Sequence, residues 1–259
     1  MKIATFNING IKARSEALPR WLAAEGADAD VICLQEIKSV DDAFPRADYE
    51  ALGYRVETHG QKGFNGVAIL SRLPLSDIAR GLPGDAADEQ ARWIEATVAG
   101  VRVVSLYLPN GNPAPGPKYD YKLAWMARML GRARALMATE APVVLAGDYN
   151  VIPEDRDARR PQAWVADALA LPDSRAAFRR LIHLGLTEAV RAREPATPGL
   201  FTFWDYQAGA WDRDDGIRID HLLLSPQAAD RLTGAGIDRM VRAGDKPSDH
   251  VPVWATLSD

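Results

Sequence analysis

Residues 143–150 read VVLAGDYN, so an unbroken apolar run ends in a glycine followed by two polar side chains around a tyrosine. A short apolar run that ends in a turn signal is typical of a strand buried on both faces. Asp148 and Asn150 follow the run at alternate positions, where a turn presents polar side chains together. The segment therefore predicts a buried strand with a polar end in a layered α/β protein.

Polar side chains stand at the ends of other predicted strands, at Asn7, Glu36, Tyr107, Asn110, Asp220, Asp249 and His250. Strand ends from several segments can converge at one rim of packed sheets, where a rigid scaffold holds them as a site. Most of these groups offer carboxylate or amide oxygens, which suit Mg²⁺ or Mn²⁺ rather than zinc. An ion held by few protein oxygens keeps positions for water and a phosphate, as phosphodiester hydrolysis requires.

Each of these residues also has an ordinary structural explanation. Asn7 and the segment 147–150 fit turns, and Glu36 could simply end a strand. His250 is one of four histidines, and a single histidine is more often structural than catalytic. Its setting favours it, because it follows Ser248 and Asp249 in a turn before a buried strand, where a histidine can act on a phosphate near neutral pH.

Short apolar runs alternate with amphipathic stretches along the chain, and strands outnumber helices. The expected strands are Lys2–Phe6, Val31–Leu34, Tyr54–Glu57, Val67–Ser71, Arg92–Val98, Arg102–Tyr107, Val143–Ala146, Phe201–Phe203, Asp220–Leu224 and Val251–Leu257. Helices are expected from Ser15 to Gly26, over Tyr119–Met137 and over Ser174–Leu184. No repeat, low-complexity tract or flexible linker divides the chain, so residues 1–259 are predicted to form one domain.

Composition excludes several classes of protein. Hydrophobic residues make up 47% and charged residues 25% of the 259 positions, which excludes a disordered chain. The single cysteine, Cys33, excludes an internal disulfide and a cysteine-based zinc site, and it fits a reducing compartment. No secretory signal and no run of about 18 apolar residues occurs, so we expect a cytoplasmic protein that does not enter a membrane.

The charge balance bears on nucleic acid as a partner. The chain has 31 Lys and Arg against 35 Asp and Glu, and the net charge of −4 opposes long-range attraction to DNA. Residues 156–193 nevertheless carry eight arginines against four acidic residues. We therefore expect weak affinity for undamaged duplex, with binding that depends on a few placed cations and on a bound metal.

Nine short segments form an ordered set along the chain: FNING (6–10), LQE (34–36), GQKG (60–63), GVAILS (66–71), YLPNG (107–111), GDYN (147–150), FWDY (203–206), RID (218–220) and KPSDHVPVW (246–254). Together they resemble the exonuclease III class of apurinic/apyrimidinic (AP) endonucleases, within the endonuclease/exonuclease/phosphatase superfamily. Each segment is weak alone, but the set spans nearly the whole chain in the family's order and is highly specific.

The resemblance implies an α/β (α+β) fold of the DNase I type, a four-layered α/β/β/α sandwich with two mixed β-sheets packed face to face and helices outside. It implies that Mg²⁺ or Mn²⁺ is bound by Asn7, Glu36, Asp148, Asn150, Asp249 and His250, with Glu36 as the principal ligand. It assigns catalysis to Tyr107, Asp148, Asn150, Asp220 and His250. In that scheme Asp148 orients or deprotonates the attacking water, while His250, held by Asp220, bonds the scissile phosphate.

The resemblance also implies where DNA would bind. An apolar pocket for an abasic deoxyribose would involve Phe203, Trp204, Ile217 and Ile219. Charge and position indicate DNA contacts at Lys12, Arg14, Lys62, Asn110, Lys118 and Arg156. The chain departs from the family pattern at Asp214 and Asp215, where a polar and a basic residue are usual, and in the Pro- and Gly-rich segment 110–118.

The implied activity is DNA repair by a monomer that acts on double-stranded DNA with abasic sites or 3′ blocks. The enzyme would incise 5′ to an abasic site and would act at 3′ ends as a 3′→5′ exonuclease and 3′-phosphatase or phosphodiesterase. Two alternatives stay open: another phosphodiesterase or phosphatase of the superfamily, and a catalytically silent DNA-binding protein. The silent alternative would require the loss of a core residue, whereas all are present in this chain.

Overall fold

Two six-stranded β-sheets lie face to face in the protein, whose computed structural model describes residues 1–259. The first sheet contains, in spatial order, β11 (Leu232–Ile237), β12 (Val253–Leu257), β1 (Lys2–Asn7), β2 (Val31–Gln35), β4 (Val67–Ser71) and β3 (Arg55–His59). The second contains β5 (Leu75–Arg80), β6 (Trp93–Val98), β7 (Val101–Tyr107), β8 (Val143–Asp148), β10 (Asp220–Leu224) and β9 (Thr187–Glu188). Both sheets are mixed, because β1 pairs with β2 and β7 with β8 in parallel while the other pairs are antiparallel.

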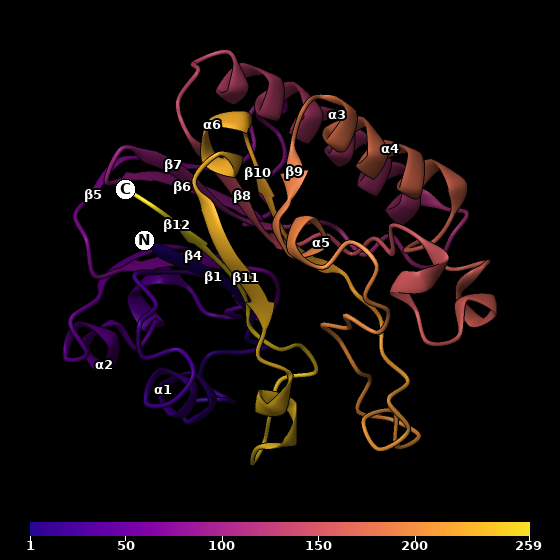
Figure 1. Cartoon of the computed structure of the whole chain (residues 1–259), viewed down its shortest axis with the longest axis horizontal. Helices are drawn as coiled ribbons and strands as arrows, with labels where there is room; N and C mark the ends of the chain where they lie inside the picture. The colour runs from indigo at the N-terminus through magenta and orange to yellow at the C-terminus, as the bar shows by residue number, and fades with distance from the viewer.

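Helices cover the outer faces of the two sheets (Figure 1). The first sheet is covered by α1 (Ala17–Leu22) and α2 (Arg46–Glu50), and the second by α3 (Pro117–Met137) and α4 (Pro172–His183). The remaining helices are α5 (Ala189–Arg193), α6 (Pro226–Ala229) and the 3-10 turns η1 (Asp41–Ala43), η2 (Asp155–Asp157), η3 (Pro161–Trp164) and η4 (Arg239–Ala243). The four-layered sandwich is confirmed. None of these helices combines the length and hydrophobicity needed to cross a membrane.

The central strands bury both of their faces, which divides the interior into three apolar layers. In β1, Ile3 faces the second sheet, whereas Ala4 and Phe6 face helix α1. On the far side, Trp93 of β6 packs edge-on against Trp125 of α3, with ring centroids 6.1 Å apart. Because helices cover the outside of both sheets, the central strands read as unbroken apolar runs in the sequence rather than as alternating ones.

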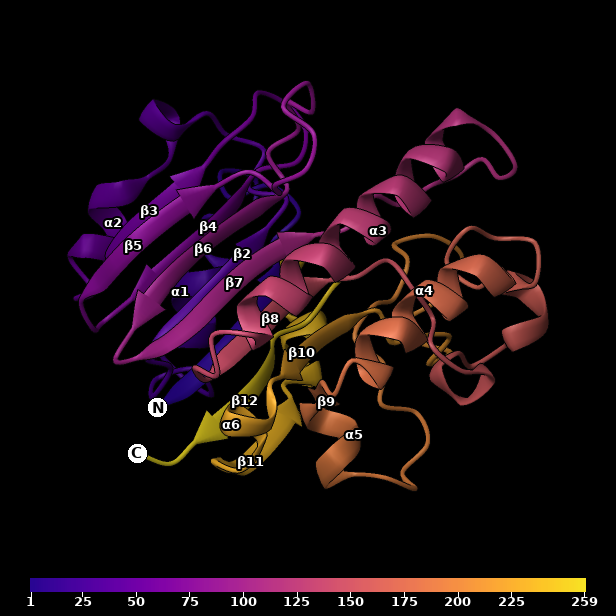
Figure 2. The same cartoon turned by 90° about the horizontal axis from the view of Figure 1, so that it is seen from above.

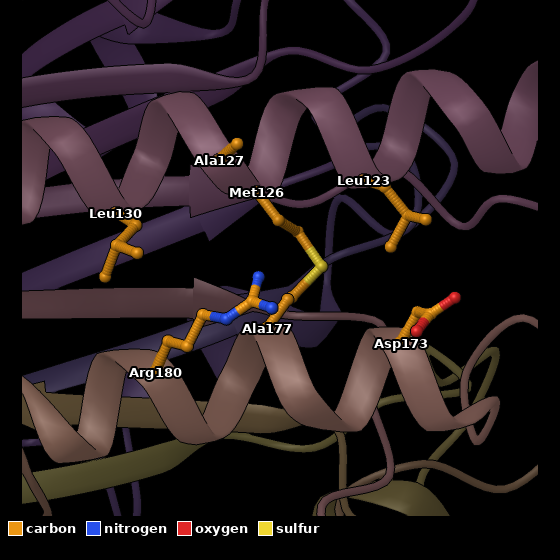
Figure 3. A pocket seen from close by; sticks show the side chains of 7 residues that line it. All are labelled: Leu123, Met126, Ala127, Leu130, Asp173, Ala177 and Arg180. Carbon is orange, nitrogen blue, oxygen red and sulfur yellow. The ribbon is translucent and has the colours of Figure 1, made fainter.

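Helices α3 and α4 lie side by side on the outside of the second sheet (Figure 2). Leu123, Met126 and Leu130 of α3 line one side of a small surface hollow, and Ala177 and Arg180 of α4 line the other, with Met126 pointing across toward Ala177 (Figure 3). The α3 positions share one helical face, as the spacing of three and four residues requires. The hollow holds none of the polar residues that end the strands, and its side chains serve to seat α4 on α3.

The structure departs from the expected elements where strands are short, exposed or glycine-rich. The sequence does not predict β5, β9 or β11, because β5 is half exposed and polar, β9 has two residues, and β11 contains two glycines. Phe201–Phe203, which we expected as a strand, forms only isolated bridges from Phe203 to Ile217 and to His250. These bridges tie the loop before β10 to the segment that leads into β12.

The register of the strands brings the polar strand ends together. Asn7 ends β1 beside Gln35 of β2, and Tyr107 ends β7 beside Asp148 of β8. The antiparallel β10 begins at Asp220, directly opposite Asp148. The ends of parallel neighbours therefore meet at one edge of the sandwich, as expected for a site built on a rigid scaffold.

Candidate active site

A cavity of about 380 Å³ opens where these strand ends meet. It is lined by six residues that the sequence predicted to be catalytic or metal-binding, namely Glu36, Tyr107, Asp148, Asn150, Asp249 and His250. The other two, Asn7 and Asp220, lie directly behind this lining and bond to members of it. The fold therefore brings all eight predicted side chains to one place.

Asp148 is the buried centre of the site. Its carboxylate accepts hydrogen bonds from the Asn7 side chain (Nδ2 to Oδ2, 3.0 Å) and from the backbone amide of Asn150 (N to Oδ1, 2.8 Å). His250 Nε2 lies 3.7 Å from Asp148 Oδ2. Burial raises the pKa of Asp148, and the positive charge of His250 opposes that rise. Three different segments thus fix the orientation of one carboxylate whose affinity for a proton is raised.

Asp220 holds the ring of His250 from the other side. Nδ1 of His250 lies 2.8 Å from Asp220 Oδ2. The Thr202 hydroxyl accepts a hydrogen bond from the backbone amide of Asp220. Burial alone would lower the pKa of His250, but Asp220 and Asp148 outweigh it and raise the pKa. At neutral pH the ring is therefore an imidazolium. A protonated ring donates at both nitrogens, so Nε2 can donate to a phosphate oxygen, and the assignment of His250 as a metal ligand stays a prediction.

Glu36 lies across the cavity from His250, at the end of β2. It accepts a hydrogen bond from Asn7 (Nδ2 to Oε1, 3.0 Å), and Lys38 Nζ lies 3.0 Å from its Oε2. Burial would raise the pKa of Glu36, but Asn7 and Lys38 bring it below its usual range. Asp249 is held in turn by Asn9 (Nδ2 to Oδ1, 2.9 Å). Hydrogen bonds therefore orient both carboxylates, and the lowered pKa of Glu36 keeps that one ionised.

The donor set fits a hard divalent cation. Oxygens of Glu36, Asp249 and Asp148 surround the cavity, and Asp148, Asp220 and His250 place ligand atoms within 4.8 Å of one another. Oδ1 of Asp220 is buried without a hydrogen-bond partner. A buried, unpaired carboxylate oxygen among other carboxylates is costly unless positive charge is nearby. Clustered carboxylate oxygens of this kind suit oxygen-preferring metals.

Tyr107 and Asn110 project from the end of β7 and the loop that follows it. Burial raises the pKa of Tyr107, and the charges of Glu36 and Asp148 raise it further, so its hydroxyl stays protonated and can donate. Asn110 Nδ2 donates to Asn150 Oδ1 over 3.2 Å. The sequence did not predict the role of Lys122, which is completely buried on α3 and donates to the backbone carbonyls of Asn110 and Asn150. Lys122 thereby joins the two loops that carry these asparagines.

Comparisons with known proteins agree with this arrangement. The profile of the Endonuclease/Exonuclease/phosphatase family matches residues 4–250. The chain belongs to this family. It is therefore a hydrolase of a family that depends on metal.

Individual relatives cover the whole length of this member of the endonuclease/exonuclease/phosphatase family. The exodeoxyribonuclease III of Haemophilus influenzae is 37% identical over 266 residues, which cover 98% of this chain and 99% of the relative. Among solved structures, an AP endonuclease from Archaeoglobus fulgidus superposes with a TM-score of 0.94 at 35% identity, and both chains are covered completely. The 3′ phosphatase NExo from Neisseria, bound to a product DNA hairpin, superposes with a TM-score of 0.96 at 37% identity, again over all of both chains.

The residues predicted to contact DNA lie at different distances from the cavity of this family member. Asn110 lines the cavity. Arg14 does not line the cavity; its Nη2 donates a hydrogen bond to the Tyr206 hydroxyl over 2.6 Å. The remaining cationic side chains are exposed, at Lys12, Lys62, Lys118 and Arg156. Arg156 is also paired with Glu154 (Nε to Oε2, 2.6 Å), so part of its charge is neutralised.

The apolar side of the cavity differs from the predicted abasic pocket. Phe203 and Ile219 line it as expected, and the Phe203 ring packs edge-on against His250 with centroids 5.0 Å apart. Trp204 is fully buried in a cluster with Phe201, and Ile217 is buried beneath the cavity, so neither side chain lines it. Alternation explains why Phe203 lines the cavity while its neighbour Trp204 does not, because successive residues of an extended segment point to opposite sides. The sequence did not predict that Trp164 and Leu169 line the cavity.

Behind the start of β10, a buried ion network fixes the segment that carries Asp220. Arg218 pairs with Asp157 (Nε to Oδ1, 2.9 Å) and with Glu188 (Nη1 to Oε2, 3.0 Å). Arg191 also reaches Asp157, over 2.9 Å. Burial would raise the pKa of Glu188, but Arg218 and His221 lower it to about 2. The network therefore stabilises the ionised form of a carboxylate far from solvent.

We expect Glu188→Gln to lower the free energy of unfolding by about 3 kcal/mol at pH 7, the value of the pKa shift from 4.5 to about 2. The folded pKa is depressed, so this contribution is present above pH 4.5 and is lost as the pH falls toward 2. Urea unfolding of both proteins at pH 7 and near pH 3 measures it. Glu194→Gln, at an exposed residue, is the matched control. Equal midpoints at pH 7 for wild type and Glu188→Gln would contradict the prediction.

Proposed function

We propose that the protein is a DNA-repair nuclease that incises duplex DNA 5′ to an abasic site. We propose that it also acts at 3′ ends as an exonuclease and as a 3′-phosphatase or phosphodiesterase. The observation that carries this proposal is the placement of the Asp148, His250 and Asp220 group beside an apolar wall of Phe203 and Ile219. A phosphate can lie against the polar side while a sugar without a base packs against the apolar one.

The proposed cofactor is Mg²⁺, which Mn²⁺ could replace. Glu36 would be the principal ligand, with Asp249, Asn7 and Asn150 close to it and Asp148 on the facing side. When bound, the ion neutralises charge on the phosphate and on the oxygen that leaves. His250 is also a proposed ligand, because its ligand atoms lie within 4.8 Å of those of Asp148 and Asp220, and in its protonated form it would donate to the phosphate.

The chain's own groups divide the reaction among them. Asp148 accepts one proton of a water whose oxygen attacks phosphorus. The bond to the upstream 3′ oxygen breaks in line with the attack, and that oxygen takes up a proton from solvent to become the 3′ hydroxyl. His250 and Tyr107 donate hydrogen bonds to the phosphate oxygens, whose charge grows as phosphorus becomes five-coordinate. Asn150 holds Asp148 through its backbone amide and faces the same cavity. These donors are fixed before the substrate arrives, which is the condition for effective stabilisation of a transition state.

The proposed partner is double-stranded DNA bound by one protein molecule, in the reducing compartment that Cys33 fits. Every side chain of the site comes from a single chain, which supports action as a monomer. Few of the residues proposed to contact DNA are exposed lysines, namely Lys12, Lys62 and Lys118, and the total charge of the chain is −4. Binding to undamaged duplex should therefore be weak and sensitive to salt.

Incubation with a duplex that carries one abasic analogue tests the proposal directly. We expect incision on the 5′ side of the analogue, leaving a 3′ hydroxyl, and trimming of 3′ ends in Mg²⁺. EDTA should abolish both, and added Mg²⁺ should restore them. The absence of metal-dependent incision and of 3′ trimming would refute the proposed function. In that case binding without cleavage would indicate a silent DNA-binding protein, and hydrolysis of another phosphoester would indicate a different activity of the family.

A further inference from the structure

A second cavity of about 310 Å³, here called the side cavity, adjoins the catalytic one. The two share a wall formed by four side chains: Trp164, Asp167, Phe203 and Asp205. Trp164 ends η3 in the long loop after β8, whereas Phe203 belongs to the loop before β10. The side cavity therefore continues the space in which the sugar is proposed to lie.

Trp164 has properties that set it apart from the other tryptophans. Of the seven in the chain, it alone has a side chain with no hydrogen bond, no aromatic partner and no cation over its ring within the protein. It is half-buried and packs only against the apolar cluster around Leu169 and Ile219. A large aromatic surface that faces two cavities and has no protein partner is available to stack on a ligand.

The chemistry of the shared wall selects the kind of ligand. Asp167 Oδ1 accepts hydrogen bonds from Asn112 Nδ2 and the Leu169 amide, and Asp205 Oδ1 accepts from the Gln207 amide. The second oxygen of each carboxylate has no partner in the protein. These oxygens repel a phosphate but accept hydrogen bonds from amino or imino groups, which nucleobases carry on their edges. In the same cavity Arg160 is paired with Asp215 (Nε to Oδ2, 2.9 Å), which neutralises part of its charge, whereas Arg213 lies 3.9 Å from Asp215 and supplies positive charge for a neighbouring phosphate.

We propose that the side cavity binds the nucleobase of the nucleotide whose 5′ phosphate is cleaved, with the base stacked on Trp164. The inference rests on the proposed nuclease function and deepens it. The phosphate lies at His250, the sugar lies against Phe203 and Ile219, and the base extends past the shared wall. An abasic residue has no base and leaves the side cavity unused. Trp164 is thus a specificity residue that favours removal of undamaged terminal nucleotides over incision at abasic sites.

Two rates of one protein preparation test the inference. Single-turnover removal of an undamaged 3′-terminal nucleotide is compared with incision at an abasic analogue, both in Mg²⁺. Trp164→Ala should lower the first rate about 10-fold more than the second, within the range measured for loss of one stacked base. Ala163→Trp, which places a bulky group in the side cavity, should change the ratio in the same direction. Val165→Ala, at an exposed neighbour that lines neither cavity, should leave both rates unchanged.

A binding measurement separates this inference from the proposed function. A duplex with 2-aminopurine at its 3′ end is titrated with Asp148→Asn protein, with and without Trp164→Ala. Stacking on Trp164 should quench the fluorescence only when Trp164 is present. Equal quenching in both proteins, an unchanged ratio of rates, or no removal of undamaged nucleotides would each overturn the inference. Absence of both abasic incision and 3′ trimming in the wild type would refute the proposed function, and the fluorescence result would still decide whether Trp164 stacks on a base.

Discussion

Asp148→Asn should lower kcat for incision at an abasic analogue by about 10³-fold or more, near the upper range for loss of a general base. The amide keeps the shape of the carboxylate but cannot accept the proton of the attacking water. In the wild type the two carboxylate oxygens of Asp148 accept one hydrogen bond each from Asn7 and Asn150. The asparagine amide can accept only one of these bonds, because its NH₂ group is a donor. Single-turnover kinetics at saturating enzyme measure the change.

The controls for this substitution separate chemistry from binding and folding. Affinity for the abasic duplex should stay measurable, because the exposed cations that we propose contact DNA are untouched. Asp155→Asn is the matched control, since Asp155 carries the same group on an exposed surface paired with Arg175. It should leave kcat within about twofold, as expected for an exposed pair. More than a tenth of the wild-type kcat in Asp148→Asn would remove Asp148 from its proposed role.

His250→Gln should lower kcat by about 10²- to 10³-fold, the effect of removing one donor to a developing negative charge. Glutamine can still donate a hydrogen bond but carries no positive charge, and it loses the Asp220 contact of 2.8 Å. Buried Asp220 and Asp148 would then face each other without the cation between them. Single-turnover kinetics on the abasic duplex give the rate, and thermal unfolding shows whether the fold is retained.

His183→Gln is the matched control for His250→Gln, because His183 is exposed at the end of α4. Its kcat should equal that of the wild type. Asp220→Asn should lower kcat by an intermediate factor. It leaves the ring of His250 in place but removes the negative charge that stabilises the protonated ring. A fall in affinity for DNA with no fall in kcat in His250→Gln would show that His250 binds substrate without taking part in the chemistry.

The fold could be predicted where local and tertiary forces agree. Val143–Ala146 is apolar because both faces of β8 are buried, so the sequence alone predicts the strand. Strand β11 is different: Gly234 and Gly236 have low strand propensity, and Trp254 of β12 packs close to Gly236. That packing is tertiary and leaves no mark within the segment itself. The two-residue β9 is likewise set by its pairing with β10.

The polar part of the site was easier to predict than its apolar part. Asp148 and His250 stand at strand ends and carry groups whose burial needs a reason, so their chemistry is visible in the sequence. Trp204 and Trp164 are both aromatic, and only the path of two loops places one in the core and the other in the cavity wall. Lys122 reads as a surface lysine on a helix, whereas the structure buries it beneath two loops.

Asn7 belongs to the first sheet and Asp148 to the second, yet they share a hydrogen bond of 3.0 Å across the interface between the sheets. The reactive arrangement therefore does not exist in a chain that has formed only one of its sheets. During synthesis, the first half of the protein contains Glu36 and Asn7 but no attacking base and no His250. A partly made or partly unfolded molecule therefore lacks the complete set of site residues, and the set is complete only when the segment before β12, which carries Asp249 and His250, has docked beside β1.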